Sequence, residues 1–323
     1  MKRAAMVFGV LAVAALVAAQ QQQAPAQQKQ PAGAAGTTQS GSAQSGSATA
    51  TPPQGKRPPQ AKTQAEFDAY NAAIANQKDP AAMEKSADDF ATKFPDSELR
   101  ALLFKAAMRG YQNANNGDKM LEESQKLLKL DPDDPEALIA SAEVIAERTR
   151  DTDLDKDQRF AQATKYAQHA LETIDTDVPI PALPANATQS QIDAQKKQID
   201  AYKGLLRSSA YSVLGTIQYD QDKYADAQSY FQKSIDAYPS QPDPVVVLRL
   251  ALALDKQGKY GDALKEANRA VELTQEGTAA GTTARHERDR LVQLTGGIPV
   301  SGSPAPPSNP PTGSAPNTTP TPH

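Results

Sequence analysis

The chain has 323 residues, no cysteine and a net charge of −4. The absence of cysteine excludes disulfides, thiolate metal sites and a cysteine nucleophile. Residues 1–62 carry six positive charges and no negative one, and residues 297–323 carry neither, so the stretch between them has a net charge of −10. This acidic body argues against nucleic acid and anionic membrane surfaces as main partners, because both require a basic face.

The first 19 residues resemble an export signal. Lys2 and Arg3 precede an apolar run from Ala4 to Ala19, whose last residues are small enough for cleavage. The run is shorter than the roughly 20 residues of a membrane-spanning helix, which favours cleavage over retention as an anchor. We therefore predict a signal peptide over 1–19 and a periplasmic or secreted protein with no integral membrane segment after cleavage.

Two flanking segments differ in composition from the middle of the chain. Residues 20–62 are rich in Gln, Ala, Gly, Ser, Thr and Pro, and residues 297–323 are rich in Pro, Ser, Thr and Gly. Such segments bury too little apolar surface to offset the entropy lost on ordering. We predict a disordered linker over 20–62, a folded domain over 63–296 and a disordered tail over 297–323.

Within the folded stretch, apolar residues recur at spacings of three and four, and Gly and Pro fall between the periodic runs. This periodicity predicts an all-α fold. In the clearest run, Gly215 lies on one predicted helix and Ala227 and Phe231 lie on the next. Two antiparallel helices approach closely where small residues line their contact, so we expect Gly215 and Ala227 to let the backbones meet around Phe231. Pro239 then ends the second helix.

This run resembles the tetratricopeptide repeat (TPR), a 34-residue helix-turn-helix unit that stacks into a solenoid. The residues that match the family pattern in order and spacing are Tyr211, Leu214, Gly215, Tyr224, Ala227, Phe231 and Pro239. Gln218 and Ser234 depart from the pattern. The resemblance implies an all-α, TPR-like solenoid of helical hairpins, and the N-terminal signal implies an exported, bacterial-type member.

Weaker copies of the pattern extend the array on both sides. The predicted units lie at about residues 64–97, 101–134, 135–177, 208–241 and 244–275, with a capping helix at 282–294. Three prolines between Asp175 and Gln189 interrupt the array before a helix from about 190 to 220. The interrupting segment, with Val178, can lie in the groove of the solenoid or on the outside of the fourth unit.

No catalytic constellation is present in the sequence. We find no nucleophile elbow, no phosphate-binding glycine loop and no zinc-binding histidine pair. The three histidines, His169, His286 and His323, are expected on the surface or at the terminus. The prediction is a protein without enzymatic activity and without a cofactor.

An acidic stretch in the third unit has the spacing of a calcium loop. Asp151, Asp153, Asp155 and Asp157 alternate with other residues, as oxygen ligands do around this cation. However, Lys156 stands where a calcium loop has the glycine of its sharp turn, and Gln162 stands where it has the bidentate carboxylate. We therefore favour a solvated loop that caps the next helix and predict no metal site.

The TPR resemblance implies a concave partner-binding face, formed by the first helix of each hairpin. The residues expected to bind a partner there are Lys105, Arg109, Gln112, Glu143, Glu147, Thr216, Tyr219 and Leu252. TPR proteins that clamp a C-terminal carboxylate use a Lys/Asn/Asn/Lys/Arg set, of which only Lys105 and Arg109 are similar here. We do not expect this chain to belong to that subclass.

Together these features predict a non-enzymatic scaffold of the cell envelope that binds a peptide or protein through its helix faces. An alternative is a structural or tethering accessory of an envelope complex or of the cell wall, of the outer-membrane assembly or cell-division type. In the alternative, the flanking segments attach the solenoid to its surroundings. Neither hypothesis names the partner.

Overall fold

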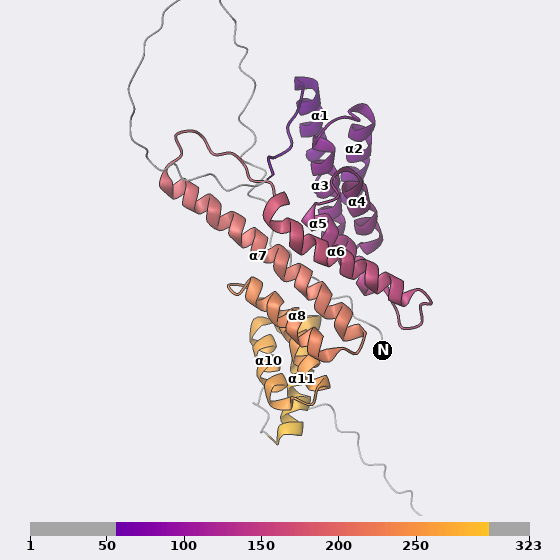
Figure 1. Ribbon diagram of the computed structural model, residues 1–323, viewed down its shortest axis with the longest axis vertical. Coiled ribbons are helices and arrows are strands. Elements are labelled where there is room, and N and C mark those ends of the chain that lie inside the picture. Colours follow the sequence, from indigo (N-terminus) through magenta and orange to yellow (C-terminus); the bar gives the residue numbers. More distant parts are fainter. Residues whose placement is uncertain (1–55, 297–323) are drawn as a thin grey trace, which may run out of the picture.

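A computed structural model describes residues 56–296, which form eleven α-helices and no β-strand (Figure 1). The predicted signal peptide, most of the predicted linker and the predicted tail lie outside the described residues. The all-α prediction is confirmed. Within the described part of the chain, no helix combines the length and the apolar character needed to cross a membrane.

The helices follow one another as antiparallel neighbours along the array. Their bounds are α1 Gln64–Ile74, α2 Pro80–Lys93, α3 Leu99–Asn113, α4 Gly117–Leu130, α5 Pro135–Arg148, α6 Lys156–Asp177, α7 Gln189–Asp220, α8 Tyr224–Ala237, α9 Pro244–Lys256, α10 Tyr260–Leu273 and α11 Ala279–Thr295. Each helix packs on the next, which makes a solenoid of TPR-like hairpins. The exact repeat boundaries stay a prediction.

Three helices begin with an Asp-Pro pair. Asp79, Asp134 and Asp243 occupy the N-cap positions of α2, α5 and α9, and each side chain accepts at least one backbone N–H hydrogen bond. The following proline suits the first helical position, because its missing N–H would have no intrahelical acceptor there. Local sequence thus defines where these helices begin.

The contact between α7 and α8 shows why small residues are needed at helix crossings. A Cβ atom added to Gly215 would lie 2.6 Å from two ring atoms of Phe231. Phe231 and Ala227 are fully buried. The expected close approach at Gly215 and Ala227 is therefore confirmed, and the space of the missing side chain is filled by the Phe231 ring.

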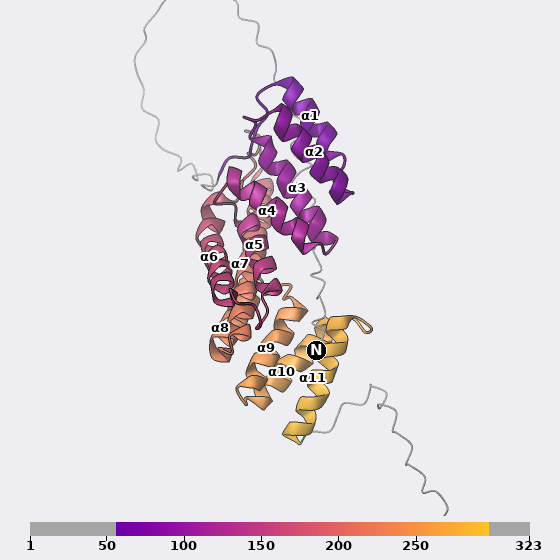
Figure 2. The same ribbon diagram turned by 90° about the vertical axis from the view of Figure 1, so that its right-hand side faces the viewer.

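The first helices of the hairpins share a layer. In addition to the contacts within hairpins, α1 packs on α3, α5 on α7, α7 on α9, and α9 on α11. The array forms an arc, with α5 and α7 toward its open side and α6 and α8 on its outer side (Figure 2). We call the surface of the first helices α3, α5, α7 and α9 the first-helix face.

The proline-rich break packs at the turn between α6 and α7. Val178 is buried with Leu138, Ile174 and Leu206, so the segment extends the core that α5, α6 and α7 share. This placement differs from both alternatives given by the sequence. The segment follows α6 directly, so Val178 continues the apolar row of Ala170 and Ile174 and meets Leu206 and Ala210 of α7.

Residues 56–62, which composition places in the disordered linker, run along the folded body. The backbone N–H of Lys56 donates to the Thr176 carbonyl at 3.1 Å, and the Ile180 N–H donates to the Lys56 carbonyl at 3.1 Å. We call residues 56–62 the strap. The difference from the prediction arises because these bonds join distant parts of the sequence, which composition does not reveal.

Candidate functional site

The predicted partner-binding residues all lie on first helices, where helical spacing places them in rows. Glu143 and Glu147 are one turn apart on α5, as are Thr216 and Tyr219 on α7. Their neighbours across the array divide the first-helix face into three polar groups.

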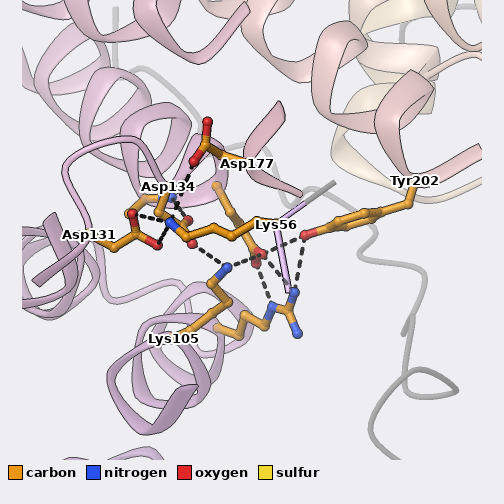
Figure 3. A network of polar contacts seen from close by, with 9 residues as sticks. Lys56, Lys105, Asp131, Asp134, Asp177 and Tyr202 are labelled. Carbon is orange, nitrogen blue, oxygen red and sulfur yellow. Dashed lines mark hydrogen bonds and ion pairs between the residues drawn. The ribbon is translucent and has the colours of Figure 1, made fainter. Parts of the chain in front are cut away.

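The first polar group joins α3, α5 and α7 (Figure 3). Arg109 donates from Nε and Nη2 to the two carboxylate oxygens of Glu136, at 2.5 and 2.6 Å. The Tyr202 hydroxyl donates to the same carboxylate at 2.7 Å. The Lys105 ammonium forms an ion pair with Asp134 and lies 3.9 Å from Glu136. Two cations thus face two carboxylates, and their charges cancel.

The electrostatics of this group follow from its geometry. Burial alone would raise the pKa of Glu136, but the charge and hydrogen bonds of Arg109, with Lys105 and Tyr202, lower it to about 2. Burial and the Glu136 charge raise the pKa of Tyr202. Lys105 and Arg109 are therefore engaged within the chain, where they tie α3 to α5 and α7.

The strap adds a second set of ion pairs beside this group. The Lys56 ammonium lies 2.6 Å from Asp131, at the C-terminal end of α4, and 3.5 Å from Asp177, at the end of α6 (Figure 3). Arg57 pairs with Glu98 at 2.6 Å. Sequence reasoning missed these contacts; the one available signal was the pair of adjacent cations, Lys56 and Arg57, in a stretch without acidic residues.

The second polar group joins α5, α7 and α9, and we call it the acidic group: Glu143, Glu147, Thr216, Asp243 and Arg249. Arg249 donates from Nη1 to the Thr216 hydroxyl at 2.9 Å. Within residues 56–296, neither Glu143 nor Glu147 has a hydrogen-bond or ion-pair partner for its carboxylate. Asp243 is used as the cap of α9, where it accepts the Val245 N–H at 2.8 Å.

The pKa values in the acidic group are raised. Burial raises the pKa of Glu143 to about 8, with a further contribution from the negative charge of Glu147, and Arg249 offsets only part of this. Burial also raises the pKa of Asp243, whereas the Glu147 side chain is exposed. The Glu143 side chain is only partly accessible to solvent. The group therefore holds more negative charge than its one guanidinium compensates.

The third polar group joins α9 to the capping helix α11. Arg290 lies 2.6 Å from Asp255 and 2.8 Å from Glu287. Burial and the neighbouring Tyr224 raise the pKa of Tyr219 to about 12. Leu252 lies between Arg249 and Asp255 on the same face of α9 and is half-buried.

Gln112 is half-buried and lies three residues after Arg109 on α3, so it extends the first-helix face beyond the first polar group. The structure thus places the predicted residues on one face but in different environments. Lys105 and Arg109 are paired, Glu143 and Glu147 are unpaired, and Gln112 and Leu252 lie at the two ends.

One group of three acidic side chains has the proximity of a metal site. Among residues 56–296, Glu84, Glu122 and Glu123 are the one group of three potential metal ligands whose ligand atoms all lie within 4.8 Å of one another. Lys119 lies 2.7 Å from Glu84, and Lys126 lies 2.7 Å from the fully buried Glu123. Two of the three carboxylates are therefore paired with lysine side chains of the chain itself.

The aspartates of the loop between α5 and α6 do not converge in this way. Asp153 accepts the Arg150 N–H at 2.9 Å and lies 3.6 Å from Arg159. Asp151 lies 3.6 Å from Lys156. Asp155 stands at the N-cap of α6 but its side chain makes no capping hydrogen bond, so the expected cap is not formed by the side chain.

The histidines lie on the surface or outside the described residues. His169 on α6 contacts Asp133 at 2.8 Å and Glu172 at 3.3 Å and is partly exposed. Burial, the largest single cause, lowers the pKa of His169. The hydrogen bonds and negative charges of Asp133 and Glu172 together outweigh it, so the pKa is raised. His286 is exposed on α11, and His323 lies outside the described residues.

Comparison with known proteins finds a distant structural likeness. No protein-family model matches the chain, and no curated protein matches it either. Among solved structures, the chain is similar to one described as the assembly chaperone of RpL4 (Acl4), residues 1–338, at 10% sequence identity and a TM-score of 0.36. The match covers 71% of this chain and 98% of that one. A likeness this distant carries no argument about function.

Proposed function

We propose that this chain is a non-enzymatic scaffold that holds a protein partner on its first-helix face. The observation that carries the proposal is that α5, α7 and α9 bring polar side chains with no role in core packing to one continuous face. Glu143 and Glu147 are the clearest of these, because they have no partner within the described chain. A surface formed by successive helices suits an extended segment, which contacts each helix in turn.

The proposal includes export to the periplasm or beyond the cell, with the partner belonging to the envelope. Its support is the sequence of residues 1–19, with two basic residues before an apolar run. Cell fractionation tests this part separately: we expect the protein in the periplasmic or secreted fraction and shortened by about 19 residues. Full-length protein in the cytoplasm would contradict it.

Site-specific photo-crosslinking tests the binding face. A photoreactive residue is placed in the full-length protein at Gln112, Glu147 or Leu252, and in control variants at Gln168 on α6 or Gln232 on α8, which are exposed on second helices. We expect one partner protein in the adducts from the first-helix positions and little from the controls. Adducts from the second-helix positions alone would contradict the proposal.

A further inference from the structure

The strap runs along the edge of the array where the connections between hairpins lie. Near α1, the Lys62 ammonium donates to the Asp96 carbonyl at 2.7 Å. Arg57 donates to both carboxylate oxygens of Glu98, at 2.9 and 2.6 Å. Asp96 and Glu98 belong to the connection between α2 and α3. The strap is therefore bound first to the connection between the first two hairpins.

Lys56 contacts the next two connections. Its ammonium lies 2.6 Å from Asp131, just after α4, and 3.5 Å from Asp177, the last residue of α6. Its backbone N–H donates to the Thr176 carbonyl, and its carbonyl accepts the Ile180 N–H, both at 3.1 Å. The strap thus joins three successive hairpins, and the chain that precedes Lys56 meets the body beside α6 rather than at α1.

The basic residues of the strap suit the helix ends that they contact. The C-terminal end of a helix carries a partial negative charge and has carbonyl groups without an intrahelical donor. Lys62, Arg57 and Lys56 lie beside residues that follow or end α2, α4 and α6. The strap contains no acidic residue, whereas the body is acidic. Electrostatic attraction therefore contributes much of what holds the strap on the body.

Little apolar surface is available to hold the strap. Its sequence is KRPPQAK, without a large apolar side chain, and Ala61 packs against the core of the first hairpins. The Arg57 side chain is 63% exposed and the Lys56 side chain 37% exposed. Exposed ion pairs contribute at most about 1 kcal/mol each, and salt screens them. A segment held in this way opens locally while the helices stay folded.

We propose that the strap is an electrostatic latch that sets where the chain before Lys56 leaves the body. When the latch is closed, this chain leaves beside the α6–α7 connection, and the first three hairpins are tied together. When it is open, the chain is attached only at Thr63, the N-cap of α1. The seven strap residues then add roughly 23 Å of extended chain. This inference does not rest on the proposed function.

Hydrogen exchange of the Ile180 amide reports the state of the latch, because this N–H of the body is bonded to the strap. Exchange is measured by NMR on the full-length protein. We expect the Ile180 amide to exchange at least about tenfold faster in about 1 M salt than in about 0.05 M salt. The control is the Ala187 amide of the same connection, which donates to the Pro184 carbonyl at 2.9 Å. Its exchange rate should change less than about twofold.

A charge variant tests the cause of the opening. In Lys56→Gln, Arg57→Gln, the Ile180 amide should already exchange fast in low salt, and added salt should have little further effect. The matched control is Lys196→Gln, Lys197→Gln, which removes two adjacent exposed cations from α7. This control should keep the salt response of the wild type. Circular dichroism and urea unfolding check that both variants are folded.

A spin label tests where the chain leaves the body. The label is attached to Gln54→Cys, two residues before Lys56, and is unique because the chain has no other cysteine. We expect it to broaden the Ile180 amide signal in low salt. The broadening should disappear in high salt and when Gln54→Cys is combined with Lys56→Gln, Arg57→Gln.

Three results would overturn the proposal. Equally slow exchange of Ile180 in both salt concentrations and in Lys56→Gln, Arg57→Gln would show a strap that does not open. Equal acceleration of Ile180 and Ala187 by salt would show general loosening of the connection instead of a latch. A label at residue 54 that leaves the Ile180 signal sharp in low salt would show that the chain does not leave the body there.

Discussion

Arg109 on α3 holds both carboxylate oxygens of Glu136 on α5, although the two residues are 27 positions apart in the chain. The pair crosses from one hairpin to the next, and Tyr202 on α7 adds a third helix to it. Such a tie opposes sliding of α3 along α5, because the two parallel hydrogen bonds fix both distance and orientation. The pair therefore stabilises the array, and the surface left for a partner lies elsewhere on the first-helix face.

Arg109→Ala should lower the free energy of unfolding by about 2 kcal/mol, because Glu136 would lose two charge-assisted hydrogen bonds while staying largely buried. The matched control is Arg57→Ala, whose pair with Glu98 is much more exposed. The control should cost less than about 1 kcal/mol. Urea unfolding followed by circular dichroism measures both, and equal losses in the two variants would contradict this account.

Gly215→Ala should destabilise the α7–α8 hairpin by about 1–3 kcal/mol, because the added Cβ would meet the Phe231 ring at 2.6 Å. The helix propensity of alanine does not compensate for this overlap. Gly261→Ala is the control, since open space surrounds that position in α10. The control should be neutral or slightly stabilising. When combined with Gly215→Ala, the change Phe231→Leu removes the ring that the added Cβ meets and should recover part of the loss.

The stability of the protein should fall as the pH rises between about 4.5 and about 8. Burial raises the pKa of Glu143 to about 8 in the folded state, so the folded protein binds a proton that the unfolded chain has already released in this range. The Glu143→Gln variant should lose this component of the pH dependence. Urea midpoints at pH 5, 7 and 9 measure the slopes, and identical slopes for the variant and the wild type would refute the assignment.

Calcium should not bind to the loop between α5 and α6. Asp153 already accepts a backbone N–H and faces Arg159, and Asp151 faces Lys156. Calorimetric titration of calcium into the protein should give no heat of binding, and neither should titration into the Asp153→Ala, Asp155→Ala variant. Heat in the wild type that disappears in the variant would show a metal site where we predict none.

Sequence alone predicted the local part of this fold. The periodicity of apolar residues predicted the helices, Pro239 predicted the end of α8, and Gly215 with Phe231 predicted the crossing of α7 and α8. Each of these depends on interactions within one hairpin or on the preferences of single residues. Sequence patterns report such features because the interacting residues are close together in the chain.

The features that sequence did not predict depend on distant partners. The strap is fixed by Lys56 with Asp131 and Asp177, and the first polar group by Arg109 with Glu136. The charge of Arg109 on a first helix was visible in the sequence, but its neutralisation by Glu136, two helices further along the array, was not. The same limit hid the difference between paired Arg109 and unpaired Glu143.

The most direct measurement of the central claim is the yield of partner adduct from a photoreactive residue at Leu252 against that from one at Gln232. Leu252 lies on the first-helix face of α9, and Gln232 is exposed on α8. If the first helices hold the partner, the Leu252 position gives the same partner adduct as Gln112 and Gln232 gives little or none. A partner adduct at Gln232 with none at Leu252 or Gln112 would contradict the account.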